Sequence, residues 1–532
     1  MRGRWPDPST HLTAARFHET PEPLSVRAGS GQSTEISLPP HCEVLGVMRE
    51  RVGADGQSYA VHFHLRLPVS WNQRFFFQGG GGTNGEIGNA VGILGEDSPP
   101  ALMQGFAVVS QDSGHDNATN RDVMHGGVTA FGFDPQARAD YGHASLQPVS
   151  QAAKALVSAY YRADPRFSYF AGCSKGGADG MAAVQRYPRE FDGVLASAPG
   201  FSLPRAAVAQ AWDVQALLAA TEDPSPASLA RAFSDQDLTL AAQGVLAACD
   251  ADDGLADGIV GAFEHCSGKK VHAALEHVQC RETKTSQCLA SGQIKALERV
   301  YSGAVDGKAR ALYSDWPWDA GIASPGWRFW KLGATDGSFP ALNVTLGGSS
   351  LAAVFTTPPT RLPDDPAAQF DYVRRFDFRR DAPRIYATSA RFPRSAWEDI
   401  SARSPDLSAF RSRSGKLIVP HGVSDPVFSI NDTLAWYREV ERRTSGEAAT
   451  FVRVFPVPGM THCGGGPATD RYDAFGALVS WVERGQAPER ILASAGPAAP
   501  WPGRTRPLCP YPQMARYKGT GNIDQAESFA CQ

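Results

Sequence analysis

Apolar and polar positions along the chain follow two periods, which indicates both strands and helices. Residues 59–67 (YAVHFHLRL) alternate polar and apolar side chains, as in a strand with one buried face. Short apolar runs at 74–77 and 106–110 predict further strands, the first of them followed by four glycines. Residues 147–161 instead repeat apolar side chains at helical spacing. The first part of the chain therefore predicts an α/β fold.

The next segment has the order of a βαβ unit. A strand, a helix and a second strand are predicted in turn at 167–170, 178–187 and 193–196. Two later strands, predicted at 415–420 and 451–457, lead into loops that carry Asp425 and His462. Three strands thus end in loops that bear a serine, an aspartate and a histidine.

The turn between the first strand and the helix contains Gly-x-Ser-x-Gly around Ser174. Glycines flank a nucleophilic serine in this way because a sharp strand-to-helix turn leaves no room for nearby Cβ atoms. The helix that follows aims its backbone N–H groups at the serine, where an oxyanion could form. The motif alone is common by chance, but the legible strand and helix around it favour a nucleophile elbow.

A serine nucleophile needs a histidine to take its proton and a carboxylate to orient that histidine. Ser174, Asp425 and His462 occur in the chain order of α/β-hydrolases. Taken singly, Asp425 is a turn residue before a proline and His462 a loop histidine. Their joint placement at strand ends favours a catalytic triad on an α/β-hydrolase core, with a mostly parallel central sheet flanked by helices.

Four segments divide the chain. Residues 1–40 are rich in Pro, Ser and charge and predict an extended N-terminal arm. The stretch between the nucleophile and the acid is rich in Trp, Pro, Gly and Asp and lacks βαβ alternation, which predicts an inserted lid domain. The predicted segments are the arm at 1–40, the first part of the core at 41–200, the lid at 201–405 and the second part of the core at 406–532.

Charge and hydropathy exclude some partners. The 532 residues include 51 Lys and Arg against 55 Asp and Glu, a net charge of -4, without a long basic run. Nucleic acid and anionic membrane surfaces are therefore not expected as partners. The chain has no uninterrupted apolar stretch of spanning length and no visible signal peptide, so we expect that a leader was cleaved or trimmed. We expect a monomer that acts on a small molecule.

Nine cysteines without a CxxC pair or a close Cys/His cluster predict disulfides rather than zinc. Disulfides imply a secreted or periplasmic protein, and an odd number leaves one thiol over. Cys173 precedes the predicted nucleophile and Cys463 follows the predicted base. If the serine and histidine meet, their neighbours fall within the roughly 4.4–6.8 Å between Cα atoms that a disulfide accepts. The alternative is a pair of buried free thiols.

Several motifs together resemble the tannase and feruloyl esterase family of α/β-hydrolases. They are GCSKGG at 172–177, GTNG at 82–85, GHDN at 114–117, FDPQAR at 133–138, VPGM at 457–460, HCG at 462–464 and RPLCPYPQ at 506–513. The resemblance covers nearly the whole chain from about residue 40. It implies an oxyanion hole made by the backbone N–H groups of Gly82 and Lys175. Relatives often carry an acidic residue where Lys175 stands, so no side-chain role is carried over.

A loop with four carboxylates within eight positions, CDADDGLADGIV at 249–260, has the hard oxygen donors that Ca²⁺ prefers. A solvated Asp/Gly turn is the alternative. The resemblance implies a structural calcium ion in the lid, bound by Asp250, Asp253 and Asp257 side chains and by the Leu255 and Ile259 carbonyls. It also implies three disulfides, Cys249–Cys266, Cys280–Cys288 and Cys509–Cys531, with Cys42 unpaired.

The resemblance further places aromatic side chains around the substrate. Trp330 of the lid and Phe428, three residues after the acid, are expected to enclose a flat acyl ring, with Gly81 also at the binding site. Some of the lid aromatics Trp327, Phe329 and Trp330 belong instead to the lid core. Relatives that cleave terephthalate monoesters hold the free carboxylate with a lid arginine, but residues 341–350 contain no basic side chain.

These features predict a serine carboxylesterase that hydrolyses esters of aromatic acids through an acyl-enzyme. Terephthalate monoesters are the first candidate substrates, and feruloyl, chlorogenate or gallate esters are the alternative. A binding protein that kept the fold is a second class, which the complete triad disfavours. A serine peptidase on the same fold is a third, disfavoured because the lid lacks a propeller repeat.

Overall fold

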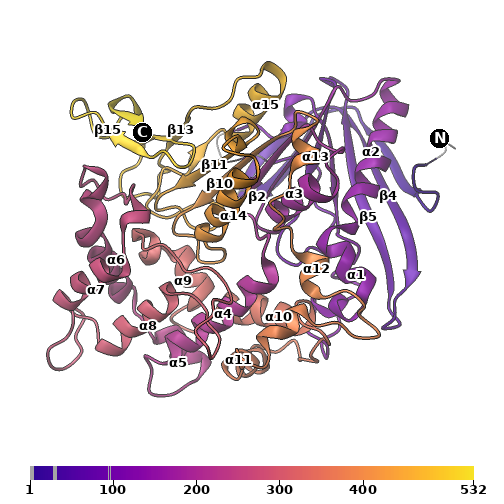
Figure 1. The fold of residues 1–532 in the computed structure, drawn as a ribbon. Coiled ribbons are helices and arrows are strands. Elements are labelled where there is room, and N and C mark those ends of the chain that lie inside the picture. Colours follow the sequence, from indigo (N-terminus) through magenta and orange to yellow (C-terminus); the bar gives the residue numbers. More distant parts are fainter. Residues whose placement is uncertain (1–4, 28–32, 94, 96–97) are drawn as a thin grey trace.

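The computed structural model of the chain describes residues 5–27, 33–93, 95 and 98–532. Within these residues the largest sheet has nine strands (Figure 1). Across the sheet their order is β1 (His11–His18), β4 (His41–Val52), β5 (Ser58–Pro68), β7 (Ala107–Gln111), β6 (Arg74–Gln78), β8 (Phe167–Cys173), β9 (Gly193–Ser197), β10 (Lys416–Gly422) and β11 (Val452–Val457).

The sheet is mixed and mostly parallel, as the sequence predicts. The neighbouring strands β7, β6, β8, β9, β10 and β11 pair in parallel. The pairs β1–β4, β4–β5 and β5–β7 are antiparallel. Every strand predicted from the apolar runs is present, with each end within three residues of its predicted bound. The carboxyl ends of β8, β10 and β11 lie at one edge of the parallel part, which is where the three candidate catalytic residues follow.

Helices cover both faces of the sheet. In β6, Phe75 and Phe77 pack into one apolar core and Phe76 into a second, because successive side chains of a strand point to opposite faces. One core receives α2 (Leu146–Tyr161), α3 (Lys175–Arg186) and α14 (Ile430–Arg443), and the other receives α15 (Ala474–Arg484). Two short helices, α1 (Pro135–Ala139) and α13 (Ser408–Arg411), complete this part. The α/β-hydrolase core is thus confirmed.

The N-terminal segment differs from the expected extended arm. β1 pairs antiparallel with β4 and forms the edge of the central sheet, and β2 (Glu22–Arg27) pairs with β3 (Ser33–Leu38) in a separate hairpin. Most side chains of β1 are exposed, so its composition resembles that of a loop. Backbone pairing with β4 rather than an apolar face holds it in place.

The segment between β9 and β10 is helical, and in this fully described stretch no strand joins a sheet. In Figure 1 it lies below and to the left of the central sheet. Its helices are α4 (Leu203–Leu218), α5 (Pro226–Arg231), α6 (Asp235–Cys249), α7 (Gly268–His277), α8 (Ser291–Tyr301), α9 (Pro325–Lys331), α10 (Ser349–Ala353), α11 (Pro366–Arg374) and α12 (Ala396–Ile400). We call this helical segment the lid.

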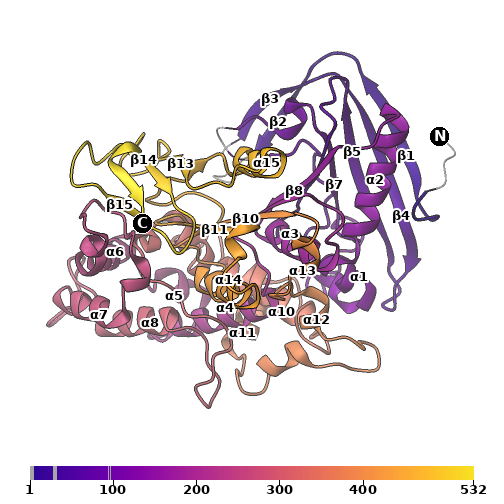
Figure 2. The same ribbon diagram turned by 45° about the horizontal axis from the view of Figure 1, so that its top comes forward.

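The C-terminal residues form two small sheets beside the lid. They comprise β12 (Arg471–Tyr472), β13 (Ile491–Ser494) and β14 (Thr505–Leu508) in one sheet, and β15 (Ala515–Tyr517) and β16 (Phe529–Cys531) in the other. Figure 2 shows β13, β14 and β15 near α6 of the lid, on the side away from β1. Among the described residues no helix is long and apolar enough to cross a membrane.

Candidate active site

Ser174 lies in the sharp turn between β8 and α3. Its backbone has φ 64° and ψ −120°, a conformation that non-glycine residues rarely adopt outside functional sites. The flanking glycines permit the close approach of two backbones. A Cβ at Gly172 would lie 2.7 Å from the Gly176 carbonyl carbon, and one at Gly176 would lie 2.6 Å from the Gly80 oxygen. The local structure is that of a nucleophile elbow.

Asp425 and His462 meet in the loops after β10 and β11. His462 Nδ1 and Asp425 Oδ2 are 2.8 Å apart, and the second carboxylate oxygen accepts hydrogen bonds from the Val427 and Phe428 amides. Burial alone would raise the pKa of the Asp425 carboxyl, but the charges and hydrogen bonds of His462 and His421 hold it well below its ordinary value. Asp425 is therefore ionised and able to orient the histidine.

The second ring nitrogen of the histidine, Nε2, has no partner among the described residues, and its position is buried. Ser174 and His462 line the same cavity, although no hydrogen bond joins them in the described structure. Catalytic hydrogen bonds often shorten only when substrate binds. The arrangement leaves one nitrogen fixed by Asp425 and one available to accept a proton.

A disulfide joins the two loops that carry the candidate serine and histidine. Cys173 and Cys463 are bonded, with 6.1 Å between their Cα atoms, so the neighbours of the serine and the histidine are linked across 290 residues of sequence. The structure also contains Cys249–Cys266, Cys280–Cys288 and Cys509–Cys531, the pairs that the resemblance implied. Cys42 is the free cysteine.

Backbone amides around Ser174 can receive an oxyanion. Gly82, at φ 55°, and Lys175, at the start of α3, have N–H groups for which the described residues supply no acceptor. The Tyr141 hydroxyl donates to the Gly82 carbonyl at 3.1 Å and thereby supports this turn. The Lys175 ammonium pairs with buried Asp179 and lies 4.5 Å from the Tyr141 ring centroid. Its side chain is thus held beside the site by α3 itself.

A cavity of about 1420 Å³ contains these groups and extends beneath the lid. Gly81, Gly82, Lys175, Trp330 and Phe428 all line it, as the sequence predicts. It also has walls that the sequence did not indicate, from α4, from α6 and from residues 496–501. This volume exceeds the roughly 300–1000 Å³ of an ordinary ligand pocket, so it can hold more than one aromatic ring.

The aromatic walls surround the histidine. The Trp330 ring lies 5.6 Å from the His462 ring and the Phe428 ring lies 5.3 Å from it, centroid to centroid, both edge-on. Of the other lid aromatics, Trp327 is buried in the lid core, whereas Phe329 is 42% exposed and stacks on Phe339 at 4.5 Å. The position of each ring on α9 therefore decides which of them can reach a substrate.

The predicted calcium loop is folded around its own backbone and the C-terminal segment. Asp250 accepts hydrogen bonds from the Asp257 and Gly258 amides, and Asp257 pairs with Arg506. Burial, together with the neighbouring carboxylates, raises the pKa of Asp253 to about 6. Such hard oxygen donors suit Ca²⁺. In the described part of the chain, however, no three His, Cys, Asp or Glu side chains are grouped so that they could hold a metal ion.

Comparisons with known proteins agree with this geometry. The sequence model of the family described as "Tannase and feruloyl esterase" matches residues 42–532. The mono(2-hydroxyethyl) terephthalate hydrolase of Piscinibacter sakaiensis is 41% identical over 99% of this chain and 89% of its own length. An uncharacterised esterase of Xanthomonas campestris is 30% identical over 98% of this chain and 89% of its own length.

A solved structure shares the fold. Feruloyl esterase B from Aspergillus oryzae superposes with a TM-score of 0.76, covering 98% of this chain and 97% of the other, at 21% sequence identity. At that identity the likeness concerns the fold alone.

Proposed function

The chain belongs to the tannase and feruloyl esterase family and is a carboxylic ester hydrolase, and we propose that it cleaves esters of aromatic acids through an acyl-enzyme on Ser174. One observation carries this proposal. His462 is fixed by Asp425 on one side and presents a free nitrogen on the other, in the same cavity as Ser174 at its elbow. Aromatic walls beside them suit a planar acyl group.

The proposed reaction has two halves. Ser174 Oγ attacks the ester carbonyl carbon while His462 Nε2 takes the hydroxyl proton, and the Gly82 and Lys175 amides donate to the oxyanion. The intermediate collapses, and the alcohol leaves with the proton from His462. A water molecule, deprotonated by the same nitrogen, then attacks the acyl-enzyme and releases the acid. Asp425 stabilises the imidazolium in both halves.

Two substrate groups fit within this reaction. Mono(2-hydroxyethyl) terephthalate, which gives its name to the 41% identical relative, would yield terephthalate and ethylene glycol. Feruloyl, chlorogenate or gallate esters are the second group. The absence of a basic side chain from residues 341–350, in the lid wall of the cavity, favours this second group.

Replacement of the nucleophile tests the reaction. We expect Ser174→Ala to lower kcat on every aromatic ester by at least about 10³-fold, since the variant lacks the hydroxyl that would form the acyl-enzyme. Ser158→Ala on the outer face of α2 is the matched control and should retain wild-type kcat. Labelling with a fluorophosphonate should require Ser174. Turnover that survives in Ser174→Ala, or a wild-type protein that takes no label, would show that the chain uses another nucleophile or only binds.

We also propose that the loop at 249–260 binds one structural Ca²⁺. Asp250, Asp253 and Asp257 lie within eight positions of one loop, and burial, followed by the charges of Asp257 and Asp250, raises the pKa of Asp253; a bound cation would offset both effects. Calcium should raise the unfolding temperature of protein pretreated with a chelator, and Asp253→Asn should abolish that rise. Magnesium is the control, because it demands a smaller octahedral site. An unfolding temperature that does not change with added calcium would refute the proposal.

For the setting, we propose a secreted or periplasmic monomer. Four disulfides in one chain are typical of an oxidising compartment. Protein isolated from its source without reduction should show one titratable thiol after unfolding, that of Cys42. Light scattering on the eluting peak should give the mass of one chain. Nine titratable thiols, or a dimer mass, would contradict this setting.

A further inference from the structure

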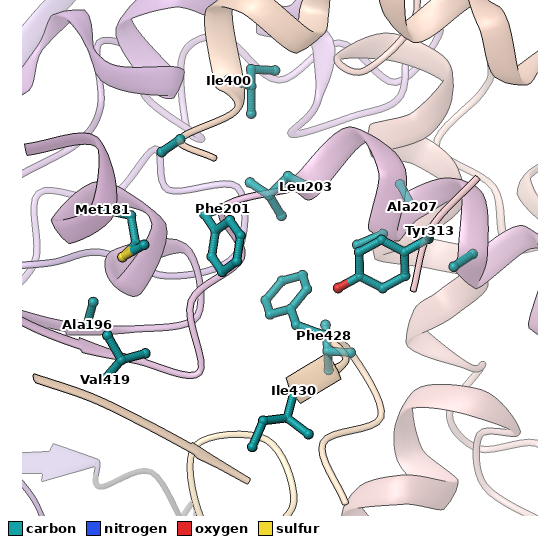
Figure 3. Close-up of a cluster of buried hydrophobic side chains, with 14 of the residues drawn as sticks. Met181, Ala196, Phe201, Leu203, Ala207, Tyr313, Ile400, Val419, Phe428 and Ile430 are labelled. Carbon is teal, nitrogen blue, oxygen red and sulfur yellow. The ribbon is translucent and has the colours of Figure 1, made fainter. Parts of the chain in front are cut away.

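One face of α4 forms a wall of the cavity. Leu203, Ala207 and Gln210 line it, and their spacing of four and three residues places them on a single helix face. Leu203 is at the end nearest the candidate triad, because its side chain and the Phe428 ring both approach the position of a Cβ at Gly200. The two side chains belong to one apolar cluster (Figure 3). Gln210 lies two turns further along, about 10 Å at 1.5 Å per residue.

Two polar side chains at this far wall have no hydrogen-bond partner among the described residues. Gln210 and Ser350 are each 5% exposed, and both line the cavity. The described residues provide no hydrogen bond to the Gln210 amide or to the Ser350 hydroxyl, and neither group is sealed from the cavity. Buried polar groups are nearly always hydrogen-bonded. The Gln210 amide and the Ser350 hydroxyl can therefore hydrogen-bond to a molecule bound in the cavity.

The fold makes room for the amide. A Cβ at Gly347 would lie 2.0 Å from Gln210 Oε1, so only glycine at this position of the π-helix Asn343–Gly348 lets the side chain rest there. The same wall carries no positive charge. The cavity cations lie elsewhere, with Lys175 paired to Asp179 on α3 and Arg471 on β12 beside Gly496. The far end is thus polar but uncharged.

We infer that Gln210, with Ser350, recognises an uncharged hydrogen-bonding substituent, a phenolic hydroxyl, at the far end of an aromatic acyl group. A hydroxyl can donate to the amide oxygen and accept from the amide nitrogen or the serine. An ionised carboxylate at the same point would lose its hydration without gaining a cation. The inference rests on the proposed esterase function and makes Gln210 the specificity-determining residue between its two substrate groups.

Matched esters test the inference. Methyl 4-hydroxycinnamate, methyl cinnamate and the monomethyl ester of 4-carboxycinnamic acid differ only in the group that would meet Gln210. We expect Gln210→Met to lower kcat/KM on the hydroxylated ester by about 10-fold, in the range of one lost hydrogen bond, and to change it less than about 2-fold on methyl cinnamate. Gln210→Arg should raise kcat/KM on the carboxylated ester, because a guanidinium pairs with a carboxylate.

Two further variants separate recognition from folding. Gly347→Ala should reproduce the selective loss by displacing the amide, whereas Gln287→Met in an exposed lid loop should change none of the three values. An equal loss on all esters in Gln210→Met would overturn the inference and leave the esterase function standing. If the wild type hydrolyses none of them, the function fails. Titration of 4-hydroxycinnamate into wild type and Gln210→Met then still decides whether the amide binds it.

Discussion

The disulfide between the catalytic loops should contribute more to stability than any other in the chain. The perturbation is Cys173→Ala with Cys463→Ala, and the matched control is Cys280→Ala with Cys288→Ala in the lid. Both double variants remove one cross-link and create two small apolar side chains. They differ in the length of chain that each link closes, 290 residues against 8.

That difference sets the expected magnitude. In the chain-entropy account, closing a loop of about 290 residues lowers the entropy of the unfolded state by an amount worth about 5–6 kcal/mol at 25 °C, against about 2.5 kcal/mol for the short loop. Removal of the catalytic-loop disulfide should therefore cost about 3 kcal/mol more than removal of the lid disulfide. The other two disulfides remain in both variants and do not affect the comparison.

Removal of the Cys173–Cys463 disulfide should also lower kcat. Ser174 and Cys463 have left-handed backbones, with φ 64° and 65°, and the disulfide ties the two turns together. Strained turns of this kind persist only where the surroundings hold them. Without the link, we expect His462 to move relative to Ser174, so that kcat falls by about 10-fold or more while the lid variant keeps its kcat.

Urea unfolding followed by tryptophan fluorescence, together with initial rates on one aromatic ester, provides both readouts. Equal losses of unfolding free energy in the two double variants would refute the loop-length reasoning. An unchanged kcat in the Cys173→Ala, Cys463→Ala variant would show that backbone packing alone holds the triad.

Three further predictions concern buried charges. Burial raises the pKa of Asp140 to about 7, so the folded protein keeps this proton between pH 4 and 7 while the unfolded chain loses it, and stability falls by up to about 4 kcal/mol over that interval. Urea titrations should show Asp140→Asn gaining on the wild type as pH rises from 4 to 7, and a constant difference would contradict this. Lys331→Met should destabilise the protein by about 3–5 kcal/mol in calorimetry, because it leaves the buried Asp213 carboxylate, 2.5 Å from the Lys331 ammonium, without a partner. A second change, Asp213→Leu, should restore most of the lost stability. If it restored none, the two residues would not act as a pair. Asp319→Ala should lower the free energy of unfolding by about 1–3 kcal/mol, because the Asp319 carboxylate accepts a hydrogen bond from the Gly459 amide in the loop that leads to His462. It should also lower kcat by a larger factor than it changes KM. Steady-state rates equal to those of the wild type would show that Asp319 does not position this loop.

The core and the candidate triad could be predicted because each depends on local sequence. Strands with buried faces leave short apolar runs, and the elbow needs glycines at fixed spacing around Ser174. Asp425 and His462 follow two such strands directly. Because the carboxyl ends of parallel strands lie at the same edge of a sheet, the sequence predicts that residues directly after these strands lie close together.

Other features depend on contacts that no local pattern records. β1 has few apolar side chains, and only its pairing with β4 reveals it as a sheet strand. On α9, helical spacing cannot say which of three neighbouring aromatics faces the cavity, and packing places Trp327 in the core but Trp330 in the cavity wall. Gln210 is one of several polar residues in α4, and its proposed role depends on a glycine more than 130 residues away.

The helix α4 links these features. It presents Leu203 to the catalytic end of the cavity and Gln210 to the far end, while Asp213 on the next turn anchors Lys331 of α9. Trp330, the neighbour of that lysine, packs edge-on against His462, the candidate catalytic histidine. One helix would therefore set both the length of the proposed acyl site and the position of its aromatic wall. Changes along α4 should alter which acyl group is accepted without moving the triad, because the triad loops are held separately by the strands and by their disulfide.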